Sequence, residues 1–470
     1  MADPATAPAT AEVWRERARA ARAMQDMAGA DQAIAEAARL APDDPLTTFL
    51  RAQSAYELGY PAAALFAKAV QLWPDNPDAL RNHALALASE GHQAEAEAML
   101  AHALAARPDW LDGQRVLASL RYSYGDAETY DAGFAAAVKA MPRHQGLWLG
   151  WFTLRAQQRD WPAARRILDA ATAQLGETRA LAVACAFLSS ESGDLAQAQA
   201  RLAALTGADD EFLALCRIRT ALRAGDAAAA RDLALPLTAT RLAGQVWPYL
   251  STAWRLLGDP NAAWLDGGLD GDPVLHGVLD PGLPAAEISD LAALLRRLHT
   301  ASLPYAEQSV RHGTQTDRSI LLRHEPLLGT VRAKLMEALR AFVSTLPPPD
   351  PRQPLPHPTL GRPRGGLQIS GSWSVRLGAG GFNVTHSHPV GWLSAVLYVG
   401  LPDDPGPAPA GALHLGAPPP ELGVQLEPYA VIPPRAGQLV VFPSFLWHGT
   451  YPFAAGERLN IAFDVVPTSA

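Results

Sequence analysis

The residues best suited to chemistry are three histidines and an arginine near the C-terminal end of the sequence. His386 and His388 stand two positions apart, His448 follows about 60 residues later, and Arg458 lies ten positions beyond it. On an extended segment, side chains two positions apart point the same way, which is what two ligands of one metal require. Each part alone is common in unrelated proteins. The combination, with strands expected on both sides, is much more specific than any of its parts.

Short apolar or alternating segments surround these residues and are expected to be strands. They are WSVRL (373–377), LSAVLYV (393–399), QLVVF (438–442) and LNIAFDVV (459–466). His448 is expected in the turn FPSFLWHGT (442–450), and Asn460 shares a strand face with Arg458. Upstream, we expect helices over 285–299 and 326–346, separated by a Thr/Gln/Ser-rich loop at 309–319.

The front half of the chain shows a repeat of about 34 residues. The recurring small residues are Gly29, Gly59, Gly91, Gly125, Gly193, Gly225 and Gly258, with one double step that places Arg159 at the skipped position. A second series agrees in period: Pro42, Pro74, Pro108, Pro142 and Gly176. Glycine ends a first helix in a left-handed cap, and proline ends a second one. The pattern predicts stacked helix pairs, which need their neighbours to bury an apolar face.

Composition limits the function classes. The chain has 470 residues, enough for two or more domains, and a formal net charge of -8, which disfavours a nucleic-acid binder. Two cysteines cannot form a disulfide framework, and we expect both to be small buried hydrophobes. No signal-like segment or long apolar run occurs, so we expect no membrane association and a cytoplasmic location.

The front half resembles the tetratricopeptide repeat family over roughly residues 10–262, on its period and on units such as SEGHQAEAEAMLAHALAARPD (89–109). A Gly/Asp/Pro-rich stretch follows, and we place a linker at 263–284. Residues 285–470 resemble the iron(II)/2-oxoglutarate oxygenases, on GSWSVRL, HSHPVGWLSAVLYV, FPSFLWHGTYPF and ERLNIAFD. More narrowly, the whole chain resembles bacterial oxygenases that combine the two parts. The expected fold is multidomain: an all-α tetratricopeptide-like solenoid, then a double-stranded β-helix (jelly-roll) with flanking helices.

The second resemblance implies a cofactor site. His386, His388 and His448 would bind iron(II), Arg458 would pair with the far carboxylate of 2-oxoglutarate, and Asn460 and Tyr398 would contact the same cosubstrate. His388 departs from the family, since most members carry an acid there. A three-histidine site also suits thiol dioxygenases and zinc, although neither needs the cation at position 458. Alternatively, His388 lies one layer behind the metal and Asp403 or Asp404 is a ligand.

Three further expectations concern function and surroundings. Trp373, Trp392 and Trp447 are expected either to line a water-excluding wall of the site or to belong to the barrel core. His414 is expected to be a strand residue rather than a ligand. By analogy with prolyl and aspartyl/asparaginyl hydroxylases, the resemblance implies hydroxylation of a protein or peptide recruited by the repeats. A small-metabolite hydroxylase with scaffolding repeats and a non-catalytic repeat adaptor are the alternatives. A homodimer formed through the repeats is left open.

Overall fold

The computed structural model describes residues 10–206, 211–267, 275–304 and 308–468. Contacts within the chain define two compact units, Met1–Met141 with Arg318–Thr330, and Pro142–Asp317 with Val331–Ala470. The boundary between the two units falls inside the helical array, between residues 141 and 142. The units therefore describe how residues pack and do not mark the domain boundaries expected from the sequence. The domain boundaries expected at 262 and 285 follow a change in composition and stay a prediction. Part of the expected linker, 268–274, lies outside the described residues.

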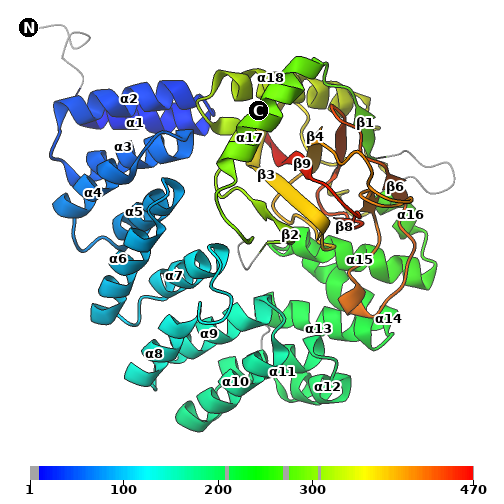
Figure 1. The fold of residues 1–470 in the computed structure, drawn as a ribbon. Helices are drawn as coiled ribbons and strands as arrows, with labels where there is room; N and C mark the ends of the chain where they lie inside the picture. The colour runs from blue at the N-terminus through cyan, green and yellow to red at the C-terminus, as the bar shows by residue number, and fades with distance from the viewer. Residues whose placement is uncertain (1–9, 207–210, 268–274, 305–307, 469–470) are drawn as a thin grey trace, which may run out of the picture. The chain divides into compact units, whose positions relative to one another are not determined.

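The first unit is built from helices that pack in consecutive pairs (Figure 1). These helices are α1 (Ala11–Ala23), α2 (Met27–Leu40), α3 (Pro45–Leu58), α4 (Ala63–Leu72), α5 (Pro77–Ser89), α6 (Gln93–Ala106), α7 (Leu111–Ser123) and α8 (Ala132–Ala140). The short 3-10 helix η3 (Ile320–Leu322) also belongs here, and α18 (Pro326–Thr345) begins here and continues in the second unit. Small side chains such as Ala52, Ala84 and Ala96 are fully buried between the helices, which lets them approach closely.

The helical array continues in the second unit with the same pairing. Its helices are α9 (Gln145–Gln157), α10 (Trp161–Leu175), α11 (Arg179–Glu191), α12 (Leu195–Ala204), α13 (Glu211–Arg223), α14 (Ala227–Ala234), α15 (Ala243–Leu257) and α16 (Asn261–Asp266). The 3-10 helix η2 (Leu235–Ala239) connects α14 to α15. After the helical array, the chain contains α17 (Ala285–Leu298), the 3-10 helix η4 (Pro420–Leu422) and the strands.

The glycine and proline punctuation is confirmed with one exception. Gly59, Gly91, Gly125, Gly193, Gly225 and Gly258 have φ between 64° and 109°, and Arg159 at the skipped position has φ 58°. This left-handed conformation is what the turn between paired helices requires. Gly29 was wrongly assigned to such a turn, because it lies in the first turn of α2 and Gln25 adopts the positive φ instead.

The C-terminal part of the second unit consists of two antiparallel sheets. The larger sheet has the order β1-β7-β4-β9-β3-β2, and the smaller has the order β6-β5-β8. The strands are β1 (Gly277–Leu279), β2 (Val310–Gln315), β3 (Gly366–Asn383), β4 (Leu393–Gly400), β5 (Leu413–Leu415), β6 (Ala430–Ile432), β7 (Leu439–Pro443), β8 (His448–Thr450) and β9 (Arg458–Thr468).

An apolar cluster joins the two sheets. It combines Val396, Tyr398, Val440 and Phe442 of the larger sheet with Leu413, Leu415 and Ile432 of the smaller one. The helices expected over 285–299 and 326–346 are present as α17 and α18. Two expectations about loops were wrong: residues 309–319 contain strand β2, and His448 begins the short strand β8 within its expected turn.

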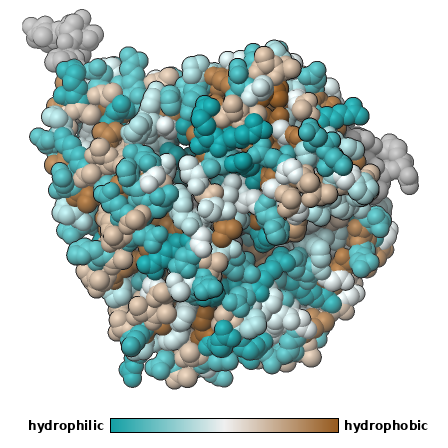
Figure 2. Space-filling view, viewed as in Figure 1, coloured by the Kyte–Doolittle hydropathy of each residue, from teal (hydrophilic) through white to brown (hydrophobic). Residues whose placement is uncertain are grey.

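Among the described residues, no helix combines the length and the apolar character that a membrane crossing requires. On the face drawn in Figure 2, hydrophilic and hydrophobic side chains of these residues are intermixed. Cys216 is buried, as expected, whereas Cys185 is only half-buried.

Candidate metal centre

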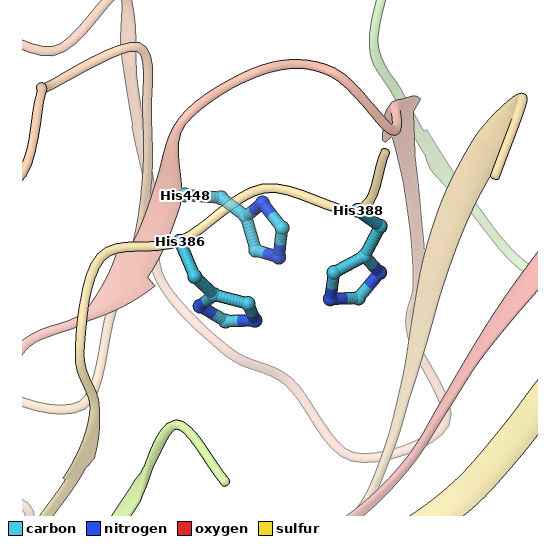
Figure 3. Close-up of side chains that lie close together, drawn as sticks. All are labelled: His386, His388 and His448. Atoms are coloured by element: carbon cyan, nitrogen blue, oxygen red, sulfur yellow. The ribbon is translucent and has the colours of Figure 1, made fainter. Parts of the chain in front are cut away.

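Three imidazole rings converge at the end of the two sheets (Figure 3). One nitrogen from each of His386, His388 and His448 lies within 4.8 Å of the others. The ring centroids are 4.3 Å apart for His386 and His448, 4.9 Å for His388 and His448, and 5.0 Å for His386 and His388. Rings at these separations can contact a single cation.

Backbone hydrogen bonds fix the positions of the three rings. The backbone N–H groups of His386 and His448 each donate to the other residue's carbonyl, at 3.0 and 2.9 Å, in an isolated antiparallel bridge. The N–H of His388 donates to the carbonyl of Ser444 at 2.8 Å. Segments about 60 residues apart in the sequence are thereby held side by side, so the geometry depends on the sheets rather than on a flexible loop.

Each ring is also held through Nδ1, by an oxygen that can only accept a hydrogen bond. The Nδ1 atoms of His386 and His448 lie 2.7 and 3.0 Å from the carbonyl oxygens of Val384 and Leu446. The Nδ1 of His388 lies 2.7 Å from Oδ1 of Asp464. Because Nδ1 carries a hydrogen toward an oxygen in all three rings, Nε2 is the nitrogen left to bind a metal ion.

Burial keeps two of these rings uncharged. Burial, reinforced by the nearby ring of His388, lowers the pKa of His386 to about 3. Burial and the proximity of His386 and His388 lower the pKa of His448 well below its ordinary value. Both rings are therefore neutral near pH 7, and no proton competes with a metal ion for their nitrogen atoms.

A buried guanidinium shares this cavity. Arg458 is 1% exposed; its Nη1 donates to the carbonyl of Gly411 at 2.9 Å, and its Nη2 donates to Oγ1 of Thr450 at 3.2 Å. Among the described residues, no hydrogen-bond partner is present for Nε of Arg458, the hydroxyl of Tyr398 or Oδ1 of Asn460. Burial lowers the pKa of Arg458, and the adjacent Tyr398 opposes that shift. A buried cation paired only with neutral oxygens is a setting in which an anion can bind favourably.

The strand register brings the polar residues together. Tyr398 of β4 and Val375 of β3 both lie directly opposite Asn460 of β9. Because side chains alternate along a strand, Arg458 and Asn460 are on the same face of β9, as the sequence predicted. That face lines a cavity of about 510 Å3, which the three histidines, Tyr398, Trp373 and Phe442 also line.

The structure separates the remaining candidates. Asp403 and Asp404 are exposed and do not join the three histidines. His414 lies on β5, as expected, with its ring 5.2 Å from that of Tyr451. Of the three tryptophans expected to line a dry wall, Trp373 lines the cavity, whereas Trp392 and Trp447 are buried in the packing around it.

Sequence reasoning missed two contributions to the site. Asp464 holds His388, and its position six residues after Arg458 puts it on the same face of β9, so strand alternation could have identified it. Gln157 and Arg159, at the end of α9, also line the cavity. No sequence signal marks them, since their approach to the cavity depends on how the helices pack on the sheets.

Comparison with known proteins gives one family match. Residues 371–464 match the family described as "Putative 2OG-Fe(II) oxygenase". No curated protein matches the sequence. Solved structures that resemble the chain include a tetratricopeptide repeat protein from Parabacteroides merdae (16% identity, 53% of this chain and 97% of that chain, TM-score 0.33). A Pseudomonas putida prolyl-4-hydroxylase is similar at 20% identity, over 42% of this chain and 94% of that chain, with a TM-score of 0.28.

Proposed function

Because residues 371–464 match the 2OG-Fe(II) oxygenase family, we propose that this chain is an iron(II)- and 2-oxoglutarate-dependent oxygenase. His386, His388 and His448 would bind iron(II), and Arg458 would bind the far carboxylate of 2-oxoglutarate. One observation carries this proposal: a guanidinium without a carboxylate partner among the described residues lies in the same cavity as three converging imidazoles. A dianionic cosubstrate that bridges a metal ion and a guanidinium would compensate both charges.

Two of the three unpartnered atoms are donors that fit such a cosubstrate. Nε of Arg458 and the hydroxyl of Tyr398 are donors that a carboxylate can satisfy. The amide of Asn460 lies on the same strand face and can donate to the same group. A zinc hydrolase or a thiol dioxygenase does not need Arg458, Tyr398 and Asn460 to bind a second carboxylate. This contrast favours 2-oxoglutarate over both alternatives.

Iron(II) and 2-oxoglutarate, when bound, would supply with dioxygen the hydroxylation of a C–H bond: one oxygen atom enters the product, the other enters succinate, and carbon dioxide is released. The protein's own contribution is positioning and exclusion of water. Trp373, Val396 and Phe442 provide apolar walls beside the histidines. We further propose that the two sheets, joined by their shared apolar cluster, form the expected double-stranded β-helix.

We propose a protein or peptide side chain as the substrate, recruited with help from the repeats. The support is that Gln157 and Arg159, which belong to the helical array, line the metal cavity. Arg159 also forms an ion pair with Glu421. A small metabolite would fit the cavity volume equally well and is the second candidate. A non-catalytic adaptor is disfavoured, because it would have no use for three converging histidines and a buried Arg458 in one cavity.

Anaerobic titration tests the proposal. Iron(II) and 2-oxoglutarate added together should produce the metal-to-ligand charge-transfer absorption that either alone does not give. The variant His448→Ala should lose both the absorption and the bound iron. His414→Ala is the matched control, since His414 is a neighbouring buried histidine that does not join the three rings. No absorption in the unchanged protein, or full absorption in His448→Ala, would contradict the proposed site.

A further inference from the structure

The carboxylate of Asp464 is hydrogen-bonded to one of the three histidines, His388. Its Oδ1 accepts a hydrogen bond from Nδ1 of His388 at 2.7 Å, and the residue is 8% exposed. The corresponding nitrogens of His386 and His448 are bound to neutral backbone carbonyls instead. The site is therefore asymmetric, with a carboxylate behind one ligand and dipoles behind the other two.

A polar network fixes the orientation of this carboxylate. Ser394, directly opposite Asp464 in the sheet, donates to Oδ1 of Asp464 at 2.6 Å, and its Oγ lies 2.9 Å from that of Ser444. Gly391 makes room for the network, because a Cβ at that position would lie 2.5 Å from Oγ of Ser444 and 3.3 Å from Cβ of Asp464. A carboxylate held by two donors in a close-packed setting has little freedom to turn away from His388.

The charge of the site gives this contact its significance. Iron(II) in oxygenases is commonly held by two histidines and one carboxylate, which removes one unit of positive charge directly. Three imidazoles remove none. A carboxylate hydrogen-bonded to a ligand imidazole makes that ring a stronger donor to the metal.

We propose that Asp464 is a positioning residue that supplies, through His388, the negative charge that the three-histidine ligand set lacks. The inference rests on the proposed function and deepens it. One face of β9 would then have two roles. Arg458 at the start of the strand would bind the cosubstrate, and Asp464, six residues later, would support the metal through His388. In this arrangement the carboxylate of Asp464 contacts a ligand histidine instead of binding the metal directly.

Asp464→Asn tests the proposal, because asparagine retains an acceptor for His388 and removes the charge. Iron(II) affinity, measured anaerobically by competition with a chromophoric chelator, should fall about 10- to 100-fold. With 2-oxoglutarate added, the charge-transfer band should move to shorter wavelength, since a weaker donor leaves iron(II) harder to oxidise. Asp266→Asn is the matched control: Asp266 is also buried and accepts from Ser251 at 2.7 Å, and its loss should leave iron affinity unchanged.

The outcomes are distinguishable. Iron affinity and band position in Asp464→Asn equal to those of the unchanged protein would overturn the role of Asp464, as would an equal loss in Asp266→Asn. Should Asp464→Asn fail to fold, Ser394→Ala decides: it removes one donor to the carboxylate and should weaken iron binding several-fold, and an unchanged affinity overturns the proposal. A wild-type protein without any charge-transfer band would instead refute the proposed function itself.

Discussion

The indole N–H of Trp447 donates a hydrogen bond to the carbonyl oxygen of Pro248 in helix α15, at 3.1 Å. It also lies 3.1 Å from Oγ1 of Thr252, one turn further along the same helix. Trp447 directly precedes His448, and the buried residues Phe445 and Leu446 belong to the same apolar cluster as α13, α15 and α16. The last helices of the array therefore pack against the turn that precedes His448 and hold it in place.

This support predicts the effect of Trp447→Phe. The variant keeps an aromatic ring but loses the hydrogen bond and part of the packing, at a cost of about 1–2 kcal/mol in stability. Because the turn then loses its anchor, iron(II) affinity should fall by about tenfold. Trp392→Phe is the control, since it removes a 2.9 Å bond to the carbonyl of Thr359 at another place. Equal iron affinities in the two variants would contradict the anchoring role.

Gly244 provides a second contact between α15 and the segment that carries His386 and His388. A Cβ at Gly244 would lie 2.0 Å from the carbonyl oxygen of Pro389, the residue after His388. Gly244→Ala should therefore displace the segment of His386 and His388, lower the thermal midpoint and weaken iron(II) binding. Gly329→Ala, in helix α18, meets no atom within 4 Å and should stabilise by up to about 1 kcal/mol. Normal iron binding by Gly244→Ala would exclude the close contact.

The helical array was predictable because its turns demand a backbone conformation that few residues adopt. Six glycines and Arg159 have positive φ at the expected positions. Gly29 shows the limit of this inference, since a glycine is also tolerated in the first turn of a helix, and Gln25 adopts the left-handed conformation in its place. The period was therefore more informative than any single glycine.

The errors in the C-terminal part came from long-range pairing. Residues 309–319 have the composition of a loop, yet Val310–Gln315 pair with β3. Gly313 permits this pairing, because a Cβ there would lie 2.3 Å from the carbonyl oxygen of Arg376. Likewise, no local pattern could place Gln157 and Arg159 at the metal cavity. The convergence of the three histidines and Arg458 on one cavity was predictable from their spacing between strands, whereas these contacts depend on tertiary packing.

Acid sensitivity should depend on His357. Burial lowers the pKa of this histidine to about 4, opposed by the backbone of Leu265 and Trp264, and its Nδ1 accepts the N–H groups of Thr359 and Leu360 at 3.0 and 3.1 Å. Since the unfolded chain takes up the proton near pH 6.5, the contribution of His357 to stability is complete above that pH. It should decline by about 3 kcal/mol as the pH falls to 4.

His357→Asn tests this dependence, because an asparagine side-chain oxygen can accept the same two N–H groups and does not titrate. Denaturant midpoints of the two proteins should differ least near pH 4 and most above pH 6.5, since only the unchanged protein loses stability through this group. The midpoint of the variant should therefore fall less on acidification. Parallel curves across this range would show that His357 does not carry the effect.

Replacement of Arg458 should separate cosubstrate binding from stability. Arg458→Met removes a buried guanidinium that has only neutral partners among the described residues, and fills much of the same volume. An uncompensated buried charge contributes little to stability, so the thermal midpoint of the metal-free protein should not fall by more than the equivalent of about 1 kcal/mol. Binding of 2-oxoglutarate should weaken by about 2–5 kcal/mol, a factor of roughly 30 or more. Iron(II) binding should be retained.

The control for this replacement is Arg376→Met. Arg376 lies on β3 with its side chain 42% exposed and paired with Glu457, outside the set of residues that line the cavity. It should leave 2-oxoglutarate affinity unchanged, as measured by the charge-transfer titration. A large loss of stability with intact cosubstrate affinity in Arg458→Met would identify Arg458 as a structural residue. The buried guanidinium would then no longer support 2-oxoglutarate as the cosubstrate.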